Sequence, residues 1–165
     1  MVSARPTPAR HLIGLVADTH EMLRAGLTAA FEGVELIIHA GDVGGREVVD
    51  RLSLLAPVLA VRGNIDPIGG AGLPSELVHD VDGLTLHVSH GHELGHPTPE
   101  ALLACYPADI IVYGHTHKAL VHRSGRRLVV NPGAAGPRRF FAVPSVARLA
   151  VENGLADVEI IELGR

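Results

Sequence analysis

Five apolar runs in this sequence each end in side chains that bind metal ions well, next to a glycine or to another side chain of that kind. In chain order, the runs end in Asp18-Thr19-His20, Gly41-Asp42, Gly63-Asn64, His90-Gly91-His92 and Gly114-His115-Thr116-His117. Short apolar runs followed by turn residues are typical of strands buried in a sheet. In open α/β sheets, ligands bind beyond the carboxyl ends of the strands. We therefore expect the five strand ends to meet at one site.

The first half of the chain alternates strands with helices. Apolar runs at 12–17, 35–40 and 58–62 are separated by segments whose apolar residues recur at helical spacing, over 22–31 and 48–55. This βαβαβ pattern predicts parallel strands joined by right-handed crossovers.

The second half of the chain is dominated by hairpin signals. Asp82-Gly83, Ser124-Gly125 and Asn153-Gly154 each separate two apolar or alternating runs and predict two-residue turns. One more helix is expected between the hairpins, capped by Thr98 and with Pro99 in its first turn. Parallel units followed by antiparallel hairpins indicate an α/β fold in which two sheets pack together with helices outside.

Length, charge and cysteine content limit the class of protein. The chain has 165 residues, and we interpret 11–165 as a single domain and 1–10 as a disordered leader. The formal net charge of −4 gives no basic field, so nucleic acid is not an expected partner. No apolar stretch is long enough for a membrane-spanning helix, so no membrane association is expected. The only cysteine, Cys105, fits a cytoplasmic protein and is expected to be a small buried side chain.

The types of polar residue point to a pair of transition-metal ions. Carboxylates combined with imidazoles suit Mn, Fe, Zn, Co or Ni better than Ca. Asp42 stands alone between glycine-flanked turns and is the best candidate for a carboxylate that bridges two ions. Asp18 and His20 are two residues apart and, in an extended segment, would face one ion together. His115 and His117 have the same spacing, but a tight turn could direct them to different ions.

A centre of this kind matches the chemistry of phosphate esters. Two divalent ions outweigh the charge of the two aspartates and of a bridging hydroxide, which leaves a positive centre for an anionic phosphoryl group. Asn64 can bind an ion through its carbonyl oxygen while its NH₂ group donates to a phosphate oxygen.

The motifs D-x-H, G-D, G-N-x-D, H-G-H and G-H-T-H, followed by Asn131-Pro132-Gly133, resemble those of the calcineurin-like metallophosphoesterase superfamily, and within it the small bacterial and archaeal phosphodiesterases. The resemblance extends over about residues 12–163 and implies a sandwich of two mixed β-sheets flanked by helices. It also implies two metal sites, the first formed by Asp18, His20, Asp42 and His117, and the second by Asp42, Asn64, His90 and His115. Of these, Asp42, Asn64 and His115 are the expected catalytic residues.

One position departs from the pattern of larger relatives, in which a histidine that protonates the leaving group follows the asparagine. Here that position is Ile65, so the resemblance implies a phosphodiesterase rather than a phosphomonoesterase. His92, two residues after His90, is a candidate substrate contact and a possible substitute acid. Attack of a metal-bridging hydroxide on a small phosphodiester is the expected reaction, with Mn the favoured metal and Fe, Ni, Zn or Co as alternatives.

A binding function is the alternative. The resemblance extends to the scaffold subunit of retromer, which shares the fold and carries G-H-T-H-K and N-P-G, so a non-catalytic protein-interaction scaffold with a retained metal site stays open. Self-association into a homo-oligomer is also compatible with the resemblance.

Several further polar residues are expected to support the site. We interpret His39 as a hydrogen-bonded residue near Asp42, Asp66 as a residue that orients the loop after Asn64, and Asn131 as one that fixes a ligand histidine. Arg138 and Arg139 are favoured as solvated turn residues over phosphate contacts.

Overall fold

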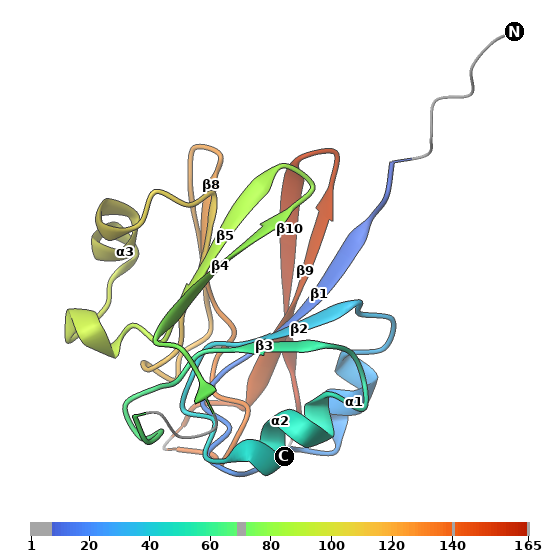
Figure 1. The fold of residues 1–165 in the computed structure, drawn as a ribbon, viewed down its shortest axis with the longest axis vertical. Helices are drawn as coiled ribbons and strands as arrows, with labels where there is room; N and C mark the ends of the chain where they lie inside the picture. The colour runs from blue at the N-terminus through green and yellow to red at the C-terminus, as the bar shows by residue number, and fades with distance from the viewer. Residues whose placement is uncertain (1–7, 69–71, 140, 165) are drawn as a thin grey trace, which may run out of the picture.

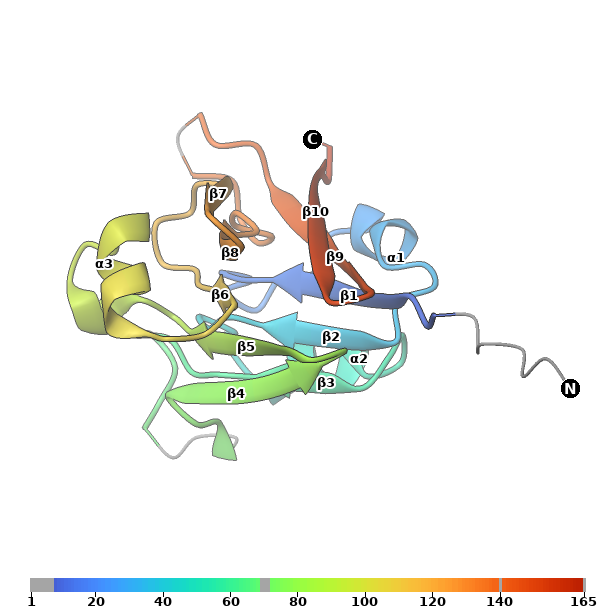
Figure 2. The same ribbon diagram turned by 90° about the horizontal axis from the view of Figure 1, so that it is seen from above.

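Two five-stranded sheets pack face to face, and helices cover their outer faces (Figures 1 and 2). The computed structural model describes residues 8–68, 72–139 and 141–164. Residues 1–7 of the expected leader lie outside the described residues. The α/β sandwich of two mixed sheets expected from the sequence is confirmed.

The first sheet joins the N-terminal parallel unit to the C-terminal hairpin. Its strands, in spatial order, are β10 (Leu155–Glu162), β9 (Ser145–Glu152), β1 (His11–Val16), β2 (Leu36–His39) and β3 (Val58–Ala60). β1, β2 and β3 pair in parallel, as predicted, whereas β9 is antiparallel to both β1 and β10.

The second sheet is built from the middle of the chain. Its strands, in spatial order, are β4 (Glu76–Val81), β5 (Leu84–Ser89), β6 (Ile110–Val112), β8 (Arg127–Asn131) and β7 (Leu120–Ser124). β5, β6 and β8 are parallel, and an antiparallel strand lies at each edge. The carboxyl ends of β5 and β6 therefore point the same way, which brings their two following loops to one edge of the sheet.

Three apolar clusters hold the layers together. The largest lies between the sheets and includes Leu15, Ile38 and Val88. The second lies between the first sheet and the helices α1 (Gly26–Ala30) and α2 (Arg46–Leu52), which Figure 1 shows side by side on that sheet. The third joins the second sheet to α3 (Pro99–Cys105). The inner strands, such as β1 and β6, are covered on both faces in this way, which explains why they read as continuous apolar runs, whereas the edge strands β4, β7 and β10 alternate between exposed and partly buried positions.

The helix after β1 begins later than its apolar spacing predicts. Residues 22–25, expected to be helical, lie outside the helix instead. The loop just before them is bonded to the loop after β2: the backbone N–H of His20 donates to the carbonyl of Asp42 (3.1 Å), and that of Glu21 to the carbonyl of Val43 (3.1 Å). These bonds between loops hold the chain before Met22 in a non-helical course, and α1 extends only over Gly26–Ala30.

The signals for α3 are confirmed, but the expected burial of its cysteine is wrong. The hydroxyl of Thr98 accepts a hydrogen bond from the N–H of Ala101 (3.2 Å), and Pro99 lies in the first turn. Cys105 is exposed. It is the last residue of a short helix in which only Leu102 is buried.

Two of the three hairpin turns form at the predicted residues. Asp82-Gly83 and Asn153-Gly154 both have the positive φ angles of a type I′ turn. In the third hairpin, Ser124 pairs with Arg127, so the turn is Gly125-Arg126 instead of Ser124-Gly125. In the described parts of the chain, no helix combines the length and the apolar character needed to cross a membrane.

Candidate metal centre

The five loops that follow β1, β2, β3, β5 and β6 meet where the edges of the two sheets come together. Backbone hydrogen bonds join the loops directly. The N–H of Asp18 donates to the carbonyl of Gly41 (3.0 Å) in the first sheet, and the N–H of Gly114 donates to the carbonyl of His90 (3.0 Å) in the second. The N–H of His115 crosses between the sheets and donates to Oδ2 of Asp18 (3.2 Å). The structure therefore places the five strand ends at one site, as expected.

One group of side chains is arranged as the ligands of a single ion would be. Asp18, His20, Asp42 and His117 each offer one atom, and these atoms lie within 4.8 Å of one another. His117 Nε2 is 3.3 Å from Asp18 Oδ1, and His20 Nε2 is 3.7 Å from Asp42 Oδ2. Two atoms that bind one ion at about 2.1 Å are themselves roughly 3–4 Å apart, so these spacings suit a shared metal.

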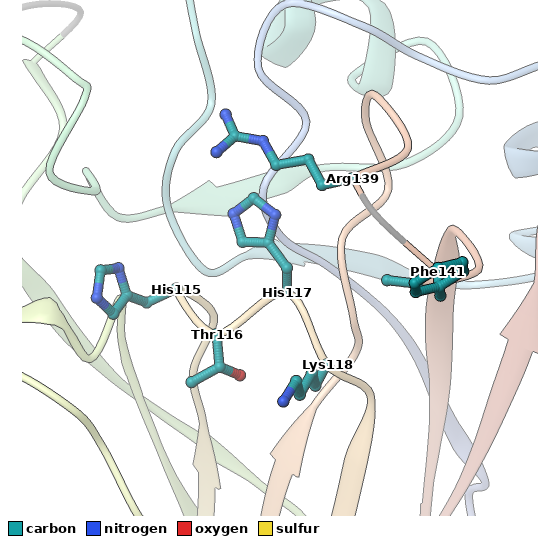
Figure 3. A pocket seen from close by; sticks show the side chains of 7 residues that line it. His115, Thr116, His117, Lys118, Arg139 and Phe141 are labelled. Carbon is teal, nitrogen blue, oxygen red and sulfur yellow. The ribbon is translucent and has the colours of Figure 1, made fainter.

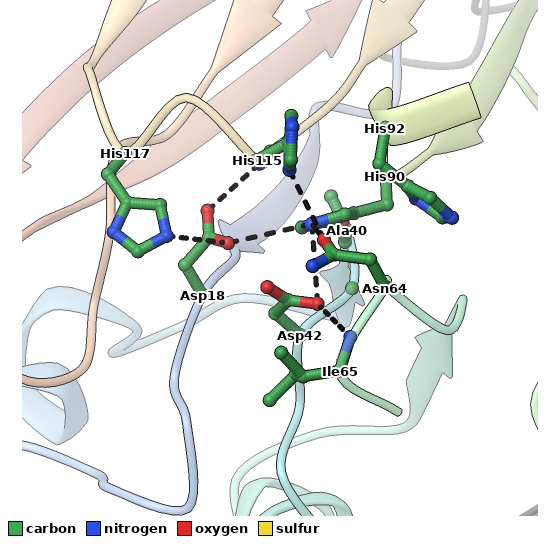
Figure 4. A network of polar contacts seen from close by, with 12 residues as sticks. Asp18, Ala40, Asp42, Asn64, Ile65, His90, His92, His115 and His117 are labelled. Atoms are coloured by element: carbon green, nitrogen blue, oxygen red, sulfur yellow. Dashed lines mark hydrogen bonds and ion pairs between the residues drawn. The ribbon is translucent and has the colours of Figure 1, made fainter. Parts of the chain in front are cut away.

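A second group lies directly beside the first (Figure 4). The Oδ1 atom of Asn64 is 3.1 Å from His90 Nε2 and 3.2 Å from His115 Nδ1. His90 Nε2 is also 3.4 Å from Asp42 Oδ1. The structure thus brings Asn64, His90 and His115 together, with His90 beside one oxygen of Asp42.

Asp42 lies between the two groups, with one carboxylate oxygen toward each. Oδ2 faces His20, whereas Oδ1 faces His90 and accepts a hydrogen bond from the N–H of Ile65 (3.1 Å). The carboxylate is 3% exposed, so its orientation is set by the surrounding protein rather than by solvent.

Residues 12–154 match the calcineurin-like phosphoesterase superfamily domain. The chain belongs to this superfamily. It is 32% identical over 163 residues to a probable metallophosphoesterase of Methanothermobacter thermautotrophicus, with 93% of each chain covered. It is 28% identical over 138 residues to a phosphodiesterase of Methanocaldococcus jannaschii, covering 73% of this chain and 82% of that one. Among solved structures, it is similar to wild-type Vps29 of Entamoeba histolytica in complex with Zn²⁺ (TM-score 0.72, 26% identity, 93% and 99% covered).

This member of the superfamily has its site on a backbone that is locally unusual. Five of the residues in the two groups have left-handed φ angles: Asp18 (52°), His20 (45°), Asp42 (51°), His115 (69°) and His117 (58°). The segment from Asp18 to His20 is therefore not extended, contrary to the sequence-based expectation. Non-glycine residues in this region typically cost on the order of 1 kcal/mol each. Tight turns held by the hydrogen bonds between loops, rather than strand geometry, direct the side chains inward.

Glycines beside the polar residues allow the loops to approach closely. A Cβ atom on Gly63 would lie 2.0 Å from Oδ1 of Asp42 and 2.3 Å from its backbone nitrogen. A Cβ atom on Gly41 would lie 2.6 Å from Nδ1 of His90, and Gly41 itself has a φ of 96°. The pairing of polar residues with glycines in the sequence therefore has a steric cause.

Residues around the two groups hold them in place, as expected for His39, Asp66 and Asn131. The carboxylate of Asp66 accepts hydrogen bonds from three backbone N–H groups, which belong to Val43 (3.0 Å), Gly44 (2.9 Å) and Gly63 (2.8 Å). It thereby ties the loop after β3 to the loop after β2.

Asn131 and His39 fix the backbone of two other loops. The NH₂ group of Asn131 donates to the carbonyl of Gly114 (2.9 Å) and to Oγ1 of Thr116 (3.0 Å), in the segment that carries His115 and His117. The ring of His39 lies between Thr19 Oγ1 (2.9 Å to Nε2) and the N–H of Gly41 (3.2 Å to Nδ1).

The electrostatics of the two groups favour ionised Asp42. Burial opposes ionisation, but the approach of the His90 ring, its charge and the N–H of Ile65 outweigh burial and lower the pKa of Asp42 to about 2. The pKa of His90 is raised, since the two aspartates and the carbonyl of Ala40 outweigh the effect of burial. Burial lowers the pKa of His20 and of His115, which favours neutral imidazoles that can bind a metal.

The donor set fits divalent transition-metal ions. Oδ1 of Asp18 and Nε2 of His20 are both buried, and neither has a hydrogen-bond partner among the described residues. A buried carboxylate oxygen without a partner is costly, and a cation removes that cost. Because this oxygen and this nitrogen belong to the first group, the arrangement is suited to a metal rather than to a hydrogen-bonded network.

Two features of this region are not visible in the sequence pattern. The carbonyl of Ala40 accepts a hydrogen bond from Nδ1 of His90 (2.8 Å), a backbone role that no side-chain pattern reveals. Arg139, interpreted as a turn residue, lines a pocket beside His115 and His117 together with Phe141. The two arginines at 138 and 139 are visible in the sequence as a basic pair, but only the fold shows that Arg139 lies next to the site.

Proposed function

We propose that this protein is a phosphodiesterase that uses two divalent metal ions. The observation that carries the proposal is the orientation of Asp42, whose two carboxylate oxygens face different groups of polar side chains. A carboxylate in that position can bind two ions at once, which an imidazole cannot readily do. Membership of the superfamily and the phosphodiesterase among the relatives support the same reaction class.

Seven residues would hold the ions. The first ion would be bound by Asp18, His20, Asp42 and His117, and the second by Asp42, Asn64, His90 and His115. In His90, the Nδ1–H group donates to Ala40, so the ring presents Nε2 to the site. Mn²⁺ is the metal we propose, with Fe, Ni, Zn and Co as the alternatives for this donor set.

Bound divalent ions would supply a hydroxide nucleophile at neutral pH and would neutralise the charge of the phosphoryl group. The residues of the chain position the substrate. The Oδ1 atom of Asn64 faces His90 and His115, so its NH₂ group is the part that donates to a phosphate oxygen. Asn64 is exposed, as a residue that meets substrate must be. His115 positions both Asn64 and, through its backbone N–H, Asp18.

The preference for diesters follows from the absence of an acid next to Asn64. Ile65 follows Asn64, is 48% exposed, and offers no proton to a leaving group. His92 is an imidazole outside the seven, and its ring centroid lies 5.4 Å from that of His90 and 6.2 Å from that of His115. We infer that His92 contacts the substrate, and that leaving groups of low pKa are favoured.

Hydrolysis of bis(p-nitrophenyl) phosphate with added Mn²⁺ tests the proposal. We expect metal-dependent turnover by the wild type that is faster than its turnover of p-nitrophenyl phosphate. Asp42→Asn should reduce the rate by more than the roughly 10–100-fold typical of residues that only orient a ligand. Elemental analysis should find two ions per wild-type chain, and circular dichroism should show that the variant is folded.

The opposite results would overturn the proposal. A metal-loaded wild type that hydrolyses neither ester, or a variant as active as the wild type, is incompatible with it. The first of these results would favour the alternative, a protein-interaction scaffold with a retained metal site, for which the likeness to Vps29 is the structural support.

A further inference from the structure

A pocket of about 550 Å³ opens next to the candidate metal centre (Figure 3). It is lined by His115, Thr116, His117, Lys118, Arg139 and Phe141. Its volume lies within the range of sites that bind small molecules. His115 and His117 belong both to the pocket and to the two groups of metal-binding candidates. A molecule whose phosphate lies at the centre would therefore extend into this pocket.

The apolar part of the pocket is an aromatic ring with little protein around it. The side chain of Phe141 is 95% exposed, whereas the ring of Phe31 is 3% exposed in the core. A phenylalanine in water gains none of the free energy of burial that normally favours its retention in a folded chain. Its ring borders a pocket beside the reaction centre, so it is available to pack against the face of a bound flat group.

The polar part of the pocket suits an anion. Lys118 and Arg139 are exposed, and neither takes part in an ion pair among the residues that the structure describes. Arg139 lines the same pocket as His117, and Figure 3 shows the two side chains next to one another. Two cations without acidic partners, in a chain of net charge −4, therefore provide a local positive field beside the centre.

Thr116 adds a directed hydrogen-bond donor. Its Oγ1 atom accepts from the NH₂ group of Asn131 (3.0 Å), so its own hydroxyl proton remains for another acceptor. Figure 3 shows the hydroxyl on the side of the loop toward Lys118. The pocket thus combines one aromatic face, two cations and one fixed hydrogen-bond donor. A flat group that carries hydrogen-bond acceptors can contact all of these, whereas a simple polyol has no face to pack against the aromatic ring.

We propose that this pocket binds the organic part of a nucleotide-type diester, with the base packed against Phe141 and the phosphate charge met by Arg139. This inference rests on the proposed function and specifies its substrate class. Phe141 is then a specificity residue: it favours substrates with an aromatic group on the retained side of the phosphate. The cleaved bond and the nucleophile are those of the proposed diester hydrolysis.

Two diesters with the same leaving group test the inference: thymidine 5′-(p-nitrophenyl phosphate) and methyl p-nitrophenyl phosphate. With the Mn²⁺-loaded protein, we expect kcat/KM to be at least about tenfold higher for the thymidine diester, the size of effect that stacking of one base supplies. Phe141→Ala should lower this ratio about tenfold. Arg139→Ala should raise KM for both diesters. Calorimetric titration with thymidine 5′-phosphate gives a second readout, and its binding should weaken about tenfold in Phe141→Ala.

Two neighbouring residues provide matched controls. Val143 is 44% exposed and lies in the same loop as Phe141, and Arg138 precedes Arg139, but neither lines this pocket. Val143→Ala and Arg138→Ala should retain the wild-type ratio. Equal hydrolysis of both diesters by the wild type, or an unchanged ratio in Phe141→Ala, would overturn the pocket inference while leaving the proposed function intact. Hydrolysis of neither diester would overturn both.

Discussion

His90 is joined to Ala40 by a 2.8 Å hydrogen bond in which the ring Nδ1–H donates to the backbone carbonyl. This bond connects the loop after β5, in one sheet, to the end of β2, in the other. It fixes the orientation of the ring and leaves Nε2 facing Asp42 and Asn64. Among the residues that the structure describes, His92, two residues later, has no hydrogen bond to the first sheet, so the two histidines of the same motif should behave differently when replaced.

Metal-dependent stability distinguishes His90 from His92. Saturating Mn²⁺ should stabilise the wild type by about 3 kcal/mol at 100 times the dissociation constant, and His92→Ala should keep this stabilisation. His90→Ala should lose most of it, because the variant lacks a ligand nitrogen of the second group. Thermal unfolding with and without Mn²⁺ measures both. Equal metal stabilisation of the two variants would contradict the assignment.

The steric role of Gly63 gives a second prediction. Gly63→Ala places a Cβ atom 2.0 Å from Oδ1 of Asp42, so the carboxylate or the loop must move. We expect a loss of stability of about 1–3 kcal/mol, as for overpacking, and at least about tenfold weaker Mn²⁺ binding. Gly45→Ala is the control, since no described atom lies within 4 Å of its added Cβ and its φ of 165° is extended. Calorimetric titration measures Mn²⁺ affinity and urea unfolding measures stability in both variants. Equal affinity and equal stability in Gly63→Ala and Gly45→Ala would refute the steric argument.

The buried ring of His39 predicts a pH dependence of folding. Burial lowers its pKa from 6.5 to about 4 and outweighs the opposing charges of Asp18 and Asp66. As pH falls, the unfolded chain takes up this proton first. The contribution of neutral His39 is therefore complete above pH 6.5 and is lost progressively as pH falls toward 4. At 1.36 kcal/mol per pH unit, the loss at pH 5 is about 2 kcal/mol.

Urea unfolding of metal-free protein between pH 8 and 5 measures this effect. His39→Gln should be less stable than the wild type at pH 8 but should lose less stability on acidification. His96→Gln, at an exposed position, controls for removal of a histidine in general. If the free energy of unfolding falls by the same amount between pH 8 and 5 in the wild type and in both variants, His39 does not stay neutral in the fold.

Asn131 provides a prediction about the loop that carries two of the candidate ligands. Asn131→Ala removes the donors to the carbonyl of Gly114 and to Thr116, while His115 and His117 remain. We expect metal affinity to fall roughly 10–100-fold and stability to fall by about 1–3 kcal/mol. Thr116→Val removes only one of the two bonds and should have the smaller effect. Calorimetric metal titration compares the losses of metal affinity in the two variants. A larger loss in Thr116→Val than in Asn131→Ala would show that the bond to Gly114 is unimportant.

Much of the fold could be predicted because the relevant signals are local. The parallel β1–β2–β3 unit follows from three apolar runs separated by helical segments, and the cap of α3 follows from Thr98 and Pro99. Where local preference conflicts with contacts made across the molecule, the prediction is wrong. Residues 22–25 have helical spacing but are not helical. They follow His20 and Glu21, whose backbone N–H groups donate to the loop after β2, a contact that no single segment encodes.

The candidate site was likewise predictable only where its signals are local. Its residue types and their positions at strand ends are visible in the sequence, and they led to the superfamily that the comparison confirms. The left-handed turns at Asp18 and His20, the exposure of Cys105 and the location of Phe141 were not predicted. Each depends on which loop or helix face packs against another, and periodicity contains no information about that.

The amino-acid sequence by itself determined the inventory of the site: two carboxylates, an amide and several imidazoles, all in the short segments that follow five strands, four of which contain a glycine. Only the tertiary structure decided that one oxygen of Asp42 faces His20 and the other faces His90. It also decided that Arg139 and Phe141 border the centre. The physical reason is that strand periodicity fixes where a chain turns, whereas the direction of a side chain in a turn is set by hydrogen bonds and steric contacts with loops distant in the sequence.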